Sequence, residues 1–126
     1  MLQFRACHRS PILRGAKTQT RRIWDAWRVN VGSLHWATTD RYRPESRFAR
    51  LCILERWEEK LGDITVTDAN AEGYTSQAGY HKALLDIYPE APLNTVVKCV
   101  RFVRVPDKTK EVRLTVVNGE LRGSDE

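Results

Sequence analysis

The alternation of hydrophobic and polar residues along this chain predicts strands and short helices in a mixed order. Arg47 to Trp57 shows the clearest strand pattern of the first half, with apolar residues on both faces, as in the wall of a barrel. Thr95 to Val105 alternates as a second long strand. Looser patterns predict strands within Thr18–Trp24 and Val31–Ala37, the latter entered through a glycine turn.

Residues typical of helix ends predict two short helices. Ser10 to Arg14 is typical of the last turns of a helix, because Gly15 tolerates the left-handed conformation of a C-terminal cap. A second helix is expected to open at Thr65, with Asp68 three residues on as a variant of the capping box, and to close near Gly73.

A third helix and a hairpin complete the pattern. The helix runs from about Ser76 to Tyr88, and Pro89 stops it. Its predicted buried stripe has spacings of three and four and consists of Tyr80, Leu84, Ile87 and Tyr88. Glu111 to Val117 alternates and is followed by Asn118-Gly119, which predicts a terminal hairpin with a two-residue turn. Gly123 onward is expected to fray.

Length and composition indicate one globular domain over residues 1–126. The 126 residues can bury roughly two thirds of the surface that the unfolded chain exposes. With 41% hydrophobic and 29% charged residues, the composition is that of a soluble globular protein. No apolar run approaches the ~20 residues of a membrane span, and the first residues lack the apolar core of a secretion signal. We therefore expect no membrane contact and a cytoplasmic location.

The cysteines favour neither a disulfide framework nor a metal site. Their number is odd, their spacing is wide, and no Cys-x-x-Cys pair occurs. Cys7 and His8 are adjacent, but no second pair of ligands has the spacing of a zinc site. Cys52 and Cys99 are expected to pack in strands, and no metal or cofactor is predicted.

Positive charge and tryptophans concentrate in the first part of the chain. Residues 1–50 carry a net charge of +8 and residues 51–126 a net charge of −3. Trp24, Trp27 and Trp36 lie in the basic part, and cations mixed with flat rings favour single-stranded nucleic acid. If residues 24–28 form a helical turn, Trp24 and Trp27 share a face, one in the core and the other at the rim of a cleft.

Four arginines surround a proline in the middle of the basic part. Arg41, Arg43, Arg47 and Arg50 around Pro44 are typical of a mobile basic loop that tracks a phosphate backbone. A solvated loop without a partner is an equally good interpretation of the same residues.

One eight-residue segment, residues 15–22, holds three cations and two hydroxyls after a glycine. Its members are Gly15, Lys17, Thr18, Thr20, Arg21 and Arg22. The cations can neutralise a phosphate, and a hydroxyl can attack an electrophile when a base lies near. The segment therefore predicts an anion-binding or nucleophilic site, although a surface lysine and a strand threonine are the plainer alternatives for Lys17 and Thr20.

A geometric condition applies to this segment. In a regular strand Lys17 and Thr20, three positions apart, point to opposite faces. Both reach one cleft only if the loop persists past Lys17, and Gly15 permits such a bend.

Four sequence blocks in one order carry a family resemblance. They are Ile12-Leu-x-Gly15-x-Lys17-Thr-x-Thr20-x-Arg22, Val31-Gly32, Leu61-x-Asp-Ile-Thr65 through Ala71-Glu72-Gly73-Tyr74, and Ile87-Tyr88-Pro89 before a strand ending Val100-Arg-Phe102. In this order they resemble the ASCH domain family, relatives of the PUA RNA-binding fold. The match spans about residues 10–105. It leaves a C-terminal hairpin extension at about residues 111–122, for which a barrel extension, a dimer contact and a lid all stay open. The sequence makes no prediction of oligomeric state.

The resemblance implies an α+β fold, a small mixed PUA-like β-barrel with short helices packed at its side. It also implies a cleft that binds RNA or a modified nucleoside. Some members are similar to amidohydrolases that deacetylate N(4)-acetylcytidine, and the corresponding catalytic residues here are Lys17, Thr20 and Glu72. Other members have been linked with ribonuclease activity, so an RNA-binding module and a single-strand ribonuclease stay open as alternatives. The residues expected to bind RNA or nucleoside are Gly15, Thr18, Arg21, Arg22, Trp24, Arg41, Arg43 and Tyr74.

The chemistry of an amidase site sets requirements on these side chains. A threonine is a poor nucleophile without a base, so Lys17 has to be neutral part of the time. Arg21 and Arg22 disfavour its ammonium form whereas Glu72 favours it. Glu72 would hand a proton to the leaving amine; a permanently charged Lys17 would instead anchor a phosphate or a carbonyl oxygen. A carboxylate at a helix C-terminus opposes the helix dipole, which favours a role for Glu72 beyond helix formation.

Overall fold

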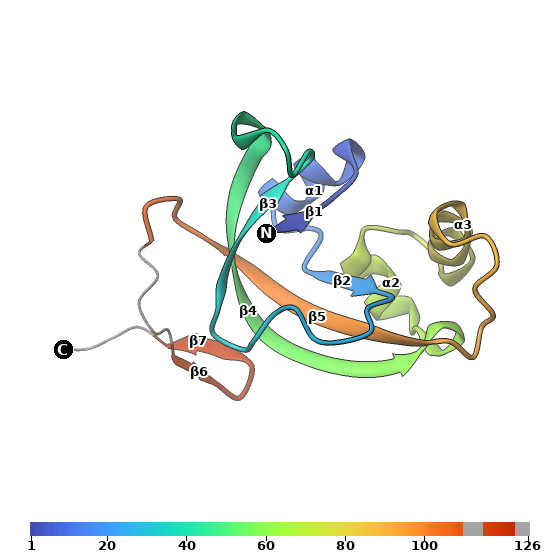
Figure 1. Cartoon of the computed structure of the whole chain (residues 1–126). Coiled ribbons are helices and arrows are strands. Elements are labelled where there is room, and N and C mark those ends of the chain that lie inside the picture. Colours follow the sequence, from blue (N-terminus) through green and yellow to red (C-terminus); the bar gives the residue numbers. More distant parts are fainter. Residues whose placement is uncertain (110–114, 123–126) are drawn as a thin grey trace.

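The computed structural model describes residues 1–109 and 115–122. Its main sheet has five strands in the order β1-β3-β4-β5-β2 and curls into a half-barrel with short helices at its side (Figure 1). The elements in chain order are β1 (Leu2–Gln3), α1 (Arg9–Leu13), β2 (Gln19–Arg22), β3 (Leu34–Thr38), β4 (Arg47–Lys60), α2 (Val66–Glu72), α3 (Gln77–Ile87), β5 (Val96–Val105), β6 (Thr115–Val117) and β7 (Glu120–Arg122), with 3-10 turns at Ala6–His8, Pro44–Ser46 and Leu61–Asp63. The α+β prediction is confirmed.

The long β4–β5 pair is the spine of the sheet. The two strands pair antiparallel from Arg50 opposite Val105 to Lys60 opposite Val96, with a register shift between Ile53 and Glu55. Residues 48–54 of β4 are all buried, so both faces of this strand are covered, as the sequence predicted. Beyond the shift, β4 continues three residues past the predicted end.

The half-barrel leaves a seam between its two edge strands. β1 pairs parallel with β3, and β2 pairs antiparallel with β5. No backbone ladder joins β1 to β2 in the described part of the chain. The side chain of Arg22 crosses the seam instead and donates from Nη2 to the carbonyl oxygen of Gln3 at 2.7 Å. Polar side chains of β2 can therefore face an opening rather than a neighbouring strand.

The helix signals in the sequence are confirmed. Gly15 ends the first helix with φ +78°, and Gly73 ends α2 with φ +103°, the left-handed region that only glycine adopts without strain. Thr65 caps α2 by accepting a hydrogen bond from the backbone N–H of Asp68 at 3.0 Å. Ser76 caps α3 in the same way.

Two hydrophobic clusters hold the elements together. The first joins β1 and α1 to β3, β4 and β5 through residues such as Leu2, Ile12 and Leu51. The second lies under α2 and α3 and includes Ile64, Leu84 and Cys99. α3 contributes buried Tyr80 and Leu84, but Ile87 of the predicted buried stripe is 51% exposed. Cys52 and Cys99 are buried in their strands, as predicted.

Two predictions about the basic part are wrong for some of their residues. Residues 24–28 form no helical turn, and Trp24 and Trp27 both pack half-buried against the first hydrophobic cluster. Arg47 and Arg50 belong to β4 rather than to a loop, and both guanidinium groups stack on the ring of Trp36. Tertiary packing overrides the local arginine–proline pattern here, because the strand begins directly after the proline turn.

The terminal hairpin is confirmed where the structure describes it. β6 and β7 pair antiparallel, and the turn residues Asn118 and Gly119 have φ +52° and +74°, as a two-residue hairpin turn requires. The carbonyl oxygen of Gly119 accepts a hydrogen bond from Arg101 of β5. The hairpin lies at the opposite end of the molecule from α3 (Figure 1). The predictions for residues 111–114 and for Gly123 onward fall outside the described residues.

The cap of α2 can be tested by stability. Thr65→Ala removes the oxygen that satisfies the Asp68 N–H, and we expect it to lower the free energy of unfolding by about 1 kcal/mol. Thr65→Ser keeps an oxygen at the same place and serves as the matched control, with little change expected. Urea unfolding of both variants measures the difference, and equal destabilisation by the two changes would contradict the capping role.

Candidate functional site

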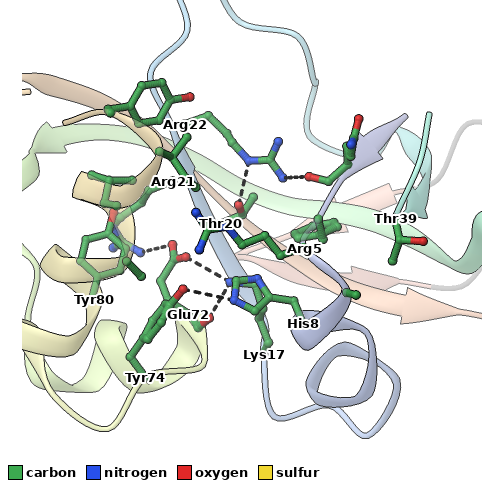
Figure 2. A pocket seen from close by; sticks show the side chains of 17 residues that line it. Arg5, His8, Lys17, Thr20, Arg21, Arg22, Thr39, Glu72, Tyr74 and Tyr80 are labelled. Carbon is green, nitrogen blue, oxygen red and sulfur yellow. Dashed lines mark hydrogen bonds and ion pairs between the residues drawn. The ribbon is translucent and has the colours of Figure 1, made fainter. Parts of the chain in front are cut away.

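A pocket of about 390 Å³ opens at the seam, between β1, β2 and the two longer helices. One wall is apolar and comes from α3 and the residue after it: Tyr80, Ala83, Leu84, Ile87 and Tyr88. The polar part of the lining carries four cationic side chains, Arg5, Lys17, Arg21 and Arg22, together with His8, Thr20 and Glu72. Figure 2 shows these side chains converging from the two halves of the chain. A volume of this size is at the small end of the range for ligand pockets.

The loop before β2 brings Lys17 and Thr20 to one pocket. The N–H groups of Ala16 and Lys17 both donate to the carbonyl oxygen of Pro11, which folds the chain back after the helix. Thr18 then donates its N–H to Ala71 of α2 and accepts from Phe102 of β5, and regular strand begins only at residue 19. The loop therefore persists past Lys17, as the geometric condition required.

Lys17 is buried against the end of α2. Its Nζ donates to the carbonyl oxygen of Glu72 at 2.5 Å and to Glu72 Oε1 at 3.1 Å. Lys17 is 2% exposed and Glu72 is 4% exposed. The ammonium sits where the helix dipole is negative, so it compensates both the Glu72 charge and the terminal carbonyl. Two of the three N–H directions of Lys17 are thus fixed by one residue.

Burial makes the charged form of Lys17 costly. It lowers the pKa of Lys17 below the ordinary value of 10.5. The charge and hydrogen bond of Glu72 raise the pKa, but Arg22 and Arg21 lower it again, and the net direction is downward. At a given pH a larger fraction of Lys17 is therefore neutral, and able to accept a proton, than of a solvated lysine.

Arg21 holds Glu72 from the other side. Its Nη1 donates to Glu72 Oε2 at 3.0 Å, its Nε and Nη2 grip the Glu59 carboxylate at 3.1 and 3.2 Å, and Nη2 also reaches Asp68. Burial opposes the charge of Arg21, yet the hydrogen bond of Glu59 and the charge of Glu72 raise its pKa. All its nitrogens are engaged by protein groups, so Arg21 positions Glu72 and is not available to hold a ligand.

Thr20 and Arg22, two residues apart on β2, form a second hydrogen-bonded unit in the lining of the pocket. The Nε of Arg22 donates to Thr20 Oγ1 at 3.0 Å, and Arg22 also lies over the ring of Phe4 at 5.0 Å (Figure 2). The Thr20 oxygen accepts from the guanidinium, which leaves its own proton to be donated elsewhere. Among the described residues no hydrogen bond joins Thr20 to Lys17.

His8 lines the pocket, although no sequence pattern marked it as a ligand-binding residue. Its ring nitrogen Nε2 lies 3.1 Å from the hydroxyl of Tyr74. Burial, followed by the charges of Lys17, Arg5 and Arg22, lowers the pKa of His8 to about 4. His8 is therefore neutral at pH 7, and the shift reports the excess of positive charge in the pocket.

The structure sorts the remaining predicted binding residues. Arg22 and Tyr74 line the pocket. Gly15 and Thr18 lie instead at a separate hollow that shares Lys17 with it. Trp24 and Arg41 line an adjoining hollow. Arg43 lines neither the pocket nor these two hollows, and it pairs with Asp40 at 3.6 Å. The pocket residues missed by the sequence, Gln3 to Ala6 and the face of α3, come from apolar or irregular segments that carry no local motif.

Two solved structures share this architecture. The ASCH domain from Lactobacillus crispatus JV V101 superposes with a TM-score of 0.66 at 15% identity, over 78% of this chain and 70% of that chain. The chain has the ASCH-domain fold. Protein EF3133 from Enterococcus faecalis V583, a DUF984 protein, shares the ASCH fold of this chain with a TM-score of 0.60 at 17% identity, over 77% of this chain and 66% of its own. At these identities the likeness establishes the fold alone.

No family model and no curated protein matches the sequence. In residues 1–109 and 115–122, no three His, Cys, Asp or Glu side chains gather in a way that would hold a metal ion. Over the same residues, none of the helices of this ASCH fold has the length and apolar character to cross a bilayer.

The buried ion pairs of Glu72 predict a large stability effect. Glu72→Ala leaves Lys17 and one arm of Arg21 without their carboxylate in a buried place, so we expect a loss of about 3–5 kcal/mol in the free energy of unfolding. Glu58→Ala is the control, since its pair with Lys98 is half exposed and is expected to contribute less than about 1 kcal/mol. Denaturant unfolding of both variants measures this, and losses of equal size would refute the assigned role of Glu72.

Proposed function

We propose that the pocket binds a nucleoside carrying an acylated amine, as in N(4)-acetylcytidine, and hydrolyses the amide. The observation that carries the proposal is the convergence of a buried lysine of lowered pKa, its fixed carboxylate partner and a threonine hydroxyl on one small pocket. The ASCH fold is compatible with this chemistry but does not specify it.

The walls of the pocket suit a base with a polar edge. Tyr88 and apolar residues of α3 line the pocket together with the cations, and an aromatic ring is a surface on which a base can stack. Because Lys17 and Glu72 are almost fully buried, only the far end of a ligand reaches them. In the proposed complex that end is the acylated exocyclic nitrogen of the base.

The first half of the reaction transfers the acyl group to Thr20. The Thr20 oxygen attacks the acyl carbon while its proton passes to the lone pair of neutral Lys17. The tetrahedral species then collapses, the carbon–nitrogen bond breaks, and the leaving amine takes the proton back from Lys17. Catalytic hydrogen bonds often tighten only with substrate bound, so the missing Lys17–Thr20 hydrogen bond does not argue against this relay.

Water completes the turnover. It attacks the ester on Thr20 and gives a proton to Lys17; the Thr20 oxygen departs and recovers that proton, and the free acid is released. Both carboxylate oxygens of Glu72 are engaged, one by Lys17 and the other by Arg21, so in this proposal Glu72 orients Lys17 rather than protonating the amine itself. Two N–H groups of Lys17 stay on Glu72, and the third position carries the transferred proton.

Turnover of N(4)-acetylcytidine tests the proposal. The purified protein should release cytidine and acetate, and Thr20→Val, which removes the hydroxyl but keeps the shape, should lower kcat by at least about 10²-fold. Thr20→Ser keeps a hydroxyl and is the matched control, expected to retain most activity. Chromatography of the products measures both.

Two outcomes would overturn the amidase assignment. One is no release of acetate by the wild-type chain. The other is equal activity of Thr20→Val and Thr20→Ser, which would remove Thr20 from the mechanism. Cleavage of single-stranded RNA by the same preparation, lost in Lys17→Ala, would instead support the ribonuclease alternative.

The pH dependence tests Lys17 as the base. Because the neutral amine is the active form, kcat/KM should rise with pH through the pKa of Lys17, and burial places this limb below pH 10.5. Glu72 raises that pKa, so Glu72→Gln should move the limb to lower pH even where it reduces the rate. Glu58→Gln, which replaces an exposed carboxylate, should leave the limb in place. A limb that stays fixed in Glu72→Gln would exclude Lys17 as the titrating base.

A further inference from the structure

A second hollow of about 300 Å³ adjoins the pocket and shares Gln3 and Arg22 with it. It is lined by two aromatic rings, Trp24 and Tyr42, and by Arg22, Arg28 and Arg41. No carboxylate lines it among the described residues. Hollows of this composition suit a phosphate flanked by a base.

The three arginines of this hollow lack acidic partners in the described part of the chain. Arg28 lies over the Trp24 ring, with 5.6 Å from its guanidinium carbon to the ring centroid, and Arg41 lies over Tyr42 at 5.0 Å. Arg22 uses Nε and Nη2 on Thr20 and Gln3, while its Nη1 has no acceptor among the described residues. Burial lowers the pKa of Arg22; the charge of Glu72 in the adjoining pocket raises it, and the charge of the nearby Arg28 lowers it. Three guanidinium groups are thus gathered around a hollow that no carboxylate lines among the described residues.

Three other arginines of the molecule show the opposite arrangement. Arg21 contacts three carboxylates, Arg43 pairs with Asp40, and Arg101 pairs with Glu55. Positive charge is therefore left uncompensated at the second hollow, although acidic residues are present elsewhere on the surface. A bound anion would satisfy both the free Arg22 nitrogen and its two neighbours.

We infer that the second hollow is a subsite for the phosphate and the adjacent nucleoside of an RNA strand. This inference rests on the proposed function, since Arg22 connects this subsite to the pocket in which the base is bound. A phosphodiester at Arg22, Arg28 and Arg41 would place the next base against the rings of Tyr42 and Trp24. The natural ligand is then a nucleotide within single-stranded RNA rather than a free nucleoside.

Binding of short probes to the intact protein tests the subsite. Isothermal titration with cytidine, its 3′- and 5′-monophosphates, and the dinucleotides CpU and UpC separates base, phosphate and flanking base. We expect one monophosphate to bind more tightly than cytidine and the matching dinucleotide to bind most tightly. Because stacking one base is worth about 1–3 kcal/mol, the flanking base should add roughly 5- to 150-fold in affinity. The affinity should fall steeply with salt.

Variants assign the effect to the subsite. Arg41→Ala and Arg28→Ala should weaken the dinucleotide and leave cytidine unchanged, and Tyr42→Ala should remove the gain from the second base alone. Tyr42 is 79% exposed, so its replacement should not disturb folding. Arg43→Ala is the matched control, because it removes the same charge from the same loop but lines neither hollow.

The outcomes distinguish the two proposals. Equal affinity for cytidine, monophosphates and dinucleotides would overturn the subsite and leave the nucleoside pocket standing. Equal weakening by Arg41→Ala and Arg43→Ala would also overturn it, since it would show general attraction by charge. Failure of all probes to bind would count against the pocket itself and therefore against the proposed function.

Discussion

The buried contact between Lys17 and Glu72 fixes the arrangement of the whole site. It ties the loop after the first helix to the last turn of α2, and Arg21 extends it to β2 and, through Glu59, to β4. Buried ion pairs are a weak source of net stability, because removing the charges from water costs about as much as their attraction returns. A network that spans four elements at the wall of a pocket is more readily explained by the chemistry that it positions.

Five cations at the pocket and the second hollow form two groups that differ in whether a carboxylate contacts them. Arg21 is saturated by carboxylates, and Lys17 is held by one, so these two residues shape the interior of the pocket. Arg22, Arg28 and Arg41 lack acidic partners in the described residues and lie toward the seam and the second hollow. The net charge of +5 therefore says less about binding than the location of the charges that remain uncompensated.

Local sequence signals predicted the fold where the structure is decided locally. The capping threonine of α2, the glycine turns and the Asn118-Gly119 hairpin were all recognisable, because each depends on neighbouring residues alone. β1 was not, since a two-residue strand is defined by its partner Ala37–Thr38 far along the chain. Likewise, the burial of Arg50 depends on β4 and Trp36, and the arginine–proline pattern does not reveal it.

The candidate site could be predicted only in part for the same reason. The residues of the loop were selected by type and Glu72 of α2 by the family resemblance, whereas His8 and the α3 wall reach the pocket only through packing.

The depth at which each charged side chain lies in the pocket favours one of the two candidate reactions, amide hydrolysis or strand cleavage, over the other. Lys17 and Glu72 lie at the buried end, and Arg22 lies at the seam. A phosphodiester is bulky and carries a negative charge, so in the proposed arrangement it stays at Arg22, away from Lys17. The exocyclic group of a base is the part of a nucleotide that extends farthest from the backbone, so in the proposed arrangement it reaches the buried end of the pocket. His8, neutral at pH 7 because burial and neighbouring cations lower its pKa to about 4, offers no proton to a departing sugar oxygen. Amide hydrolysis at the base thus matches the position and charge state of these groups better than cleavage of the strand.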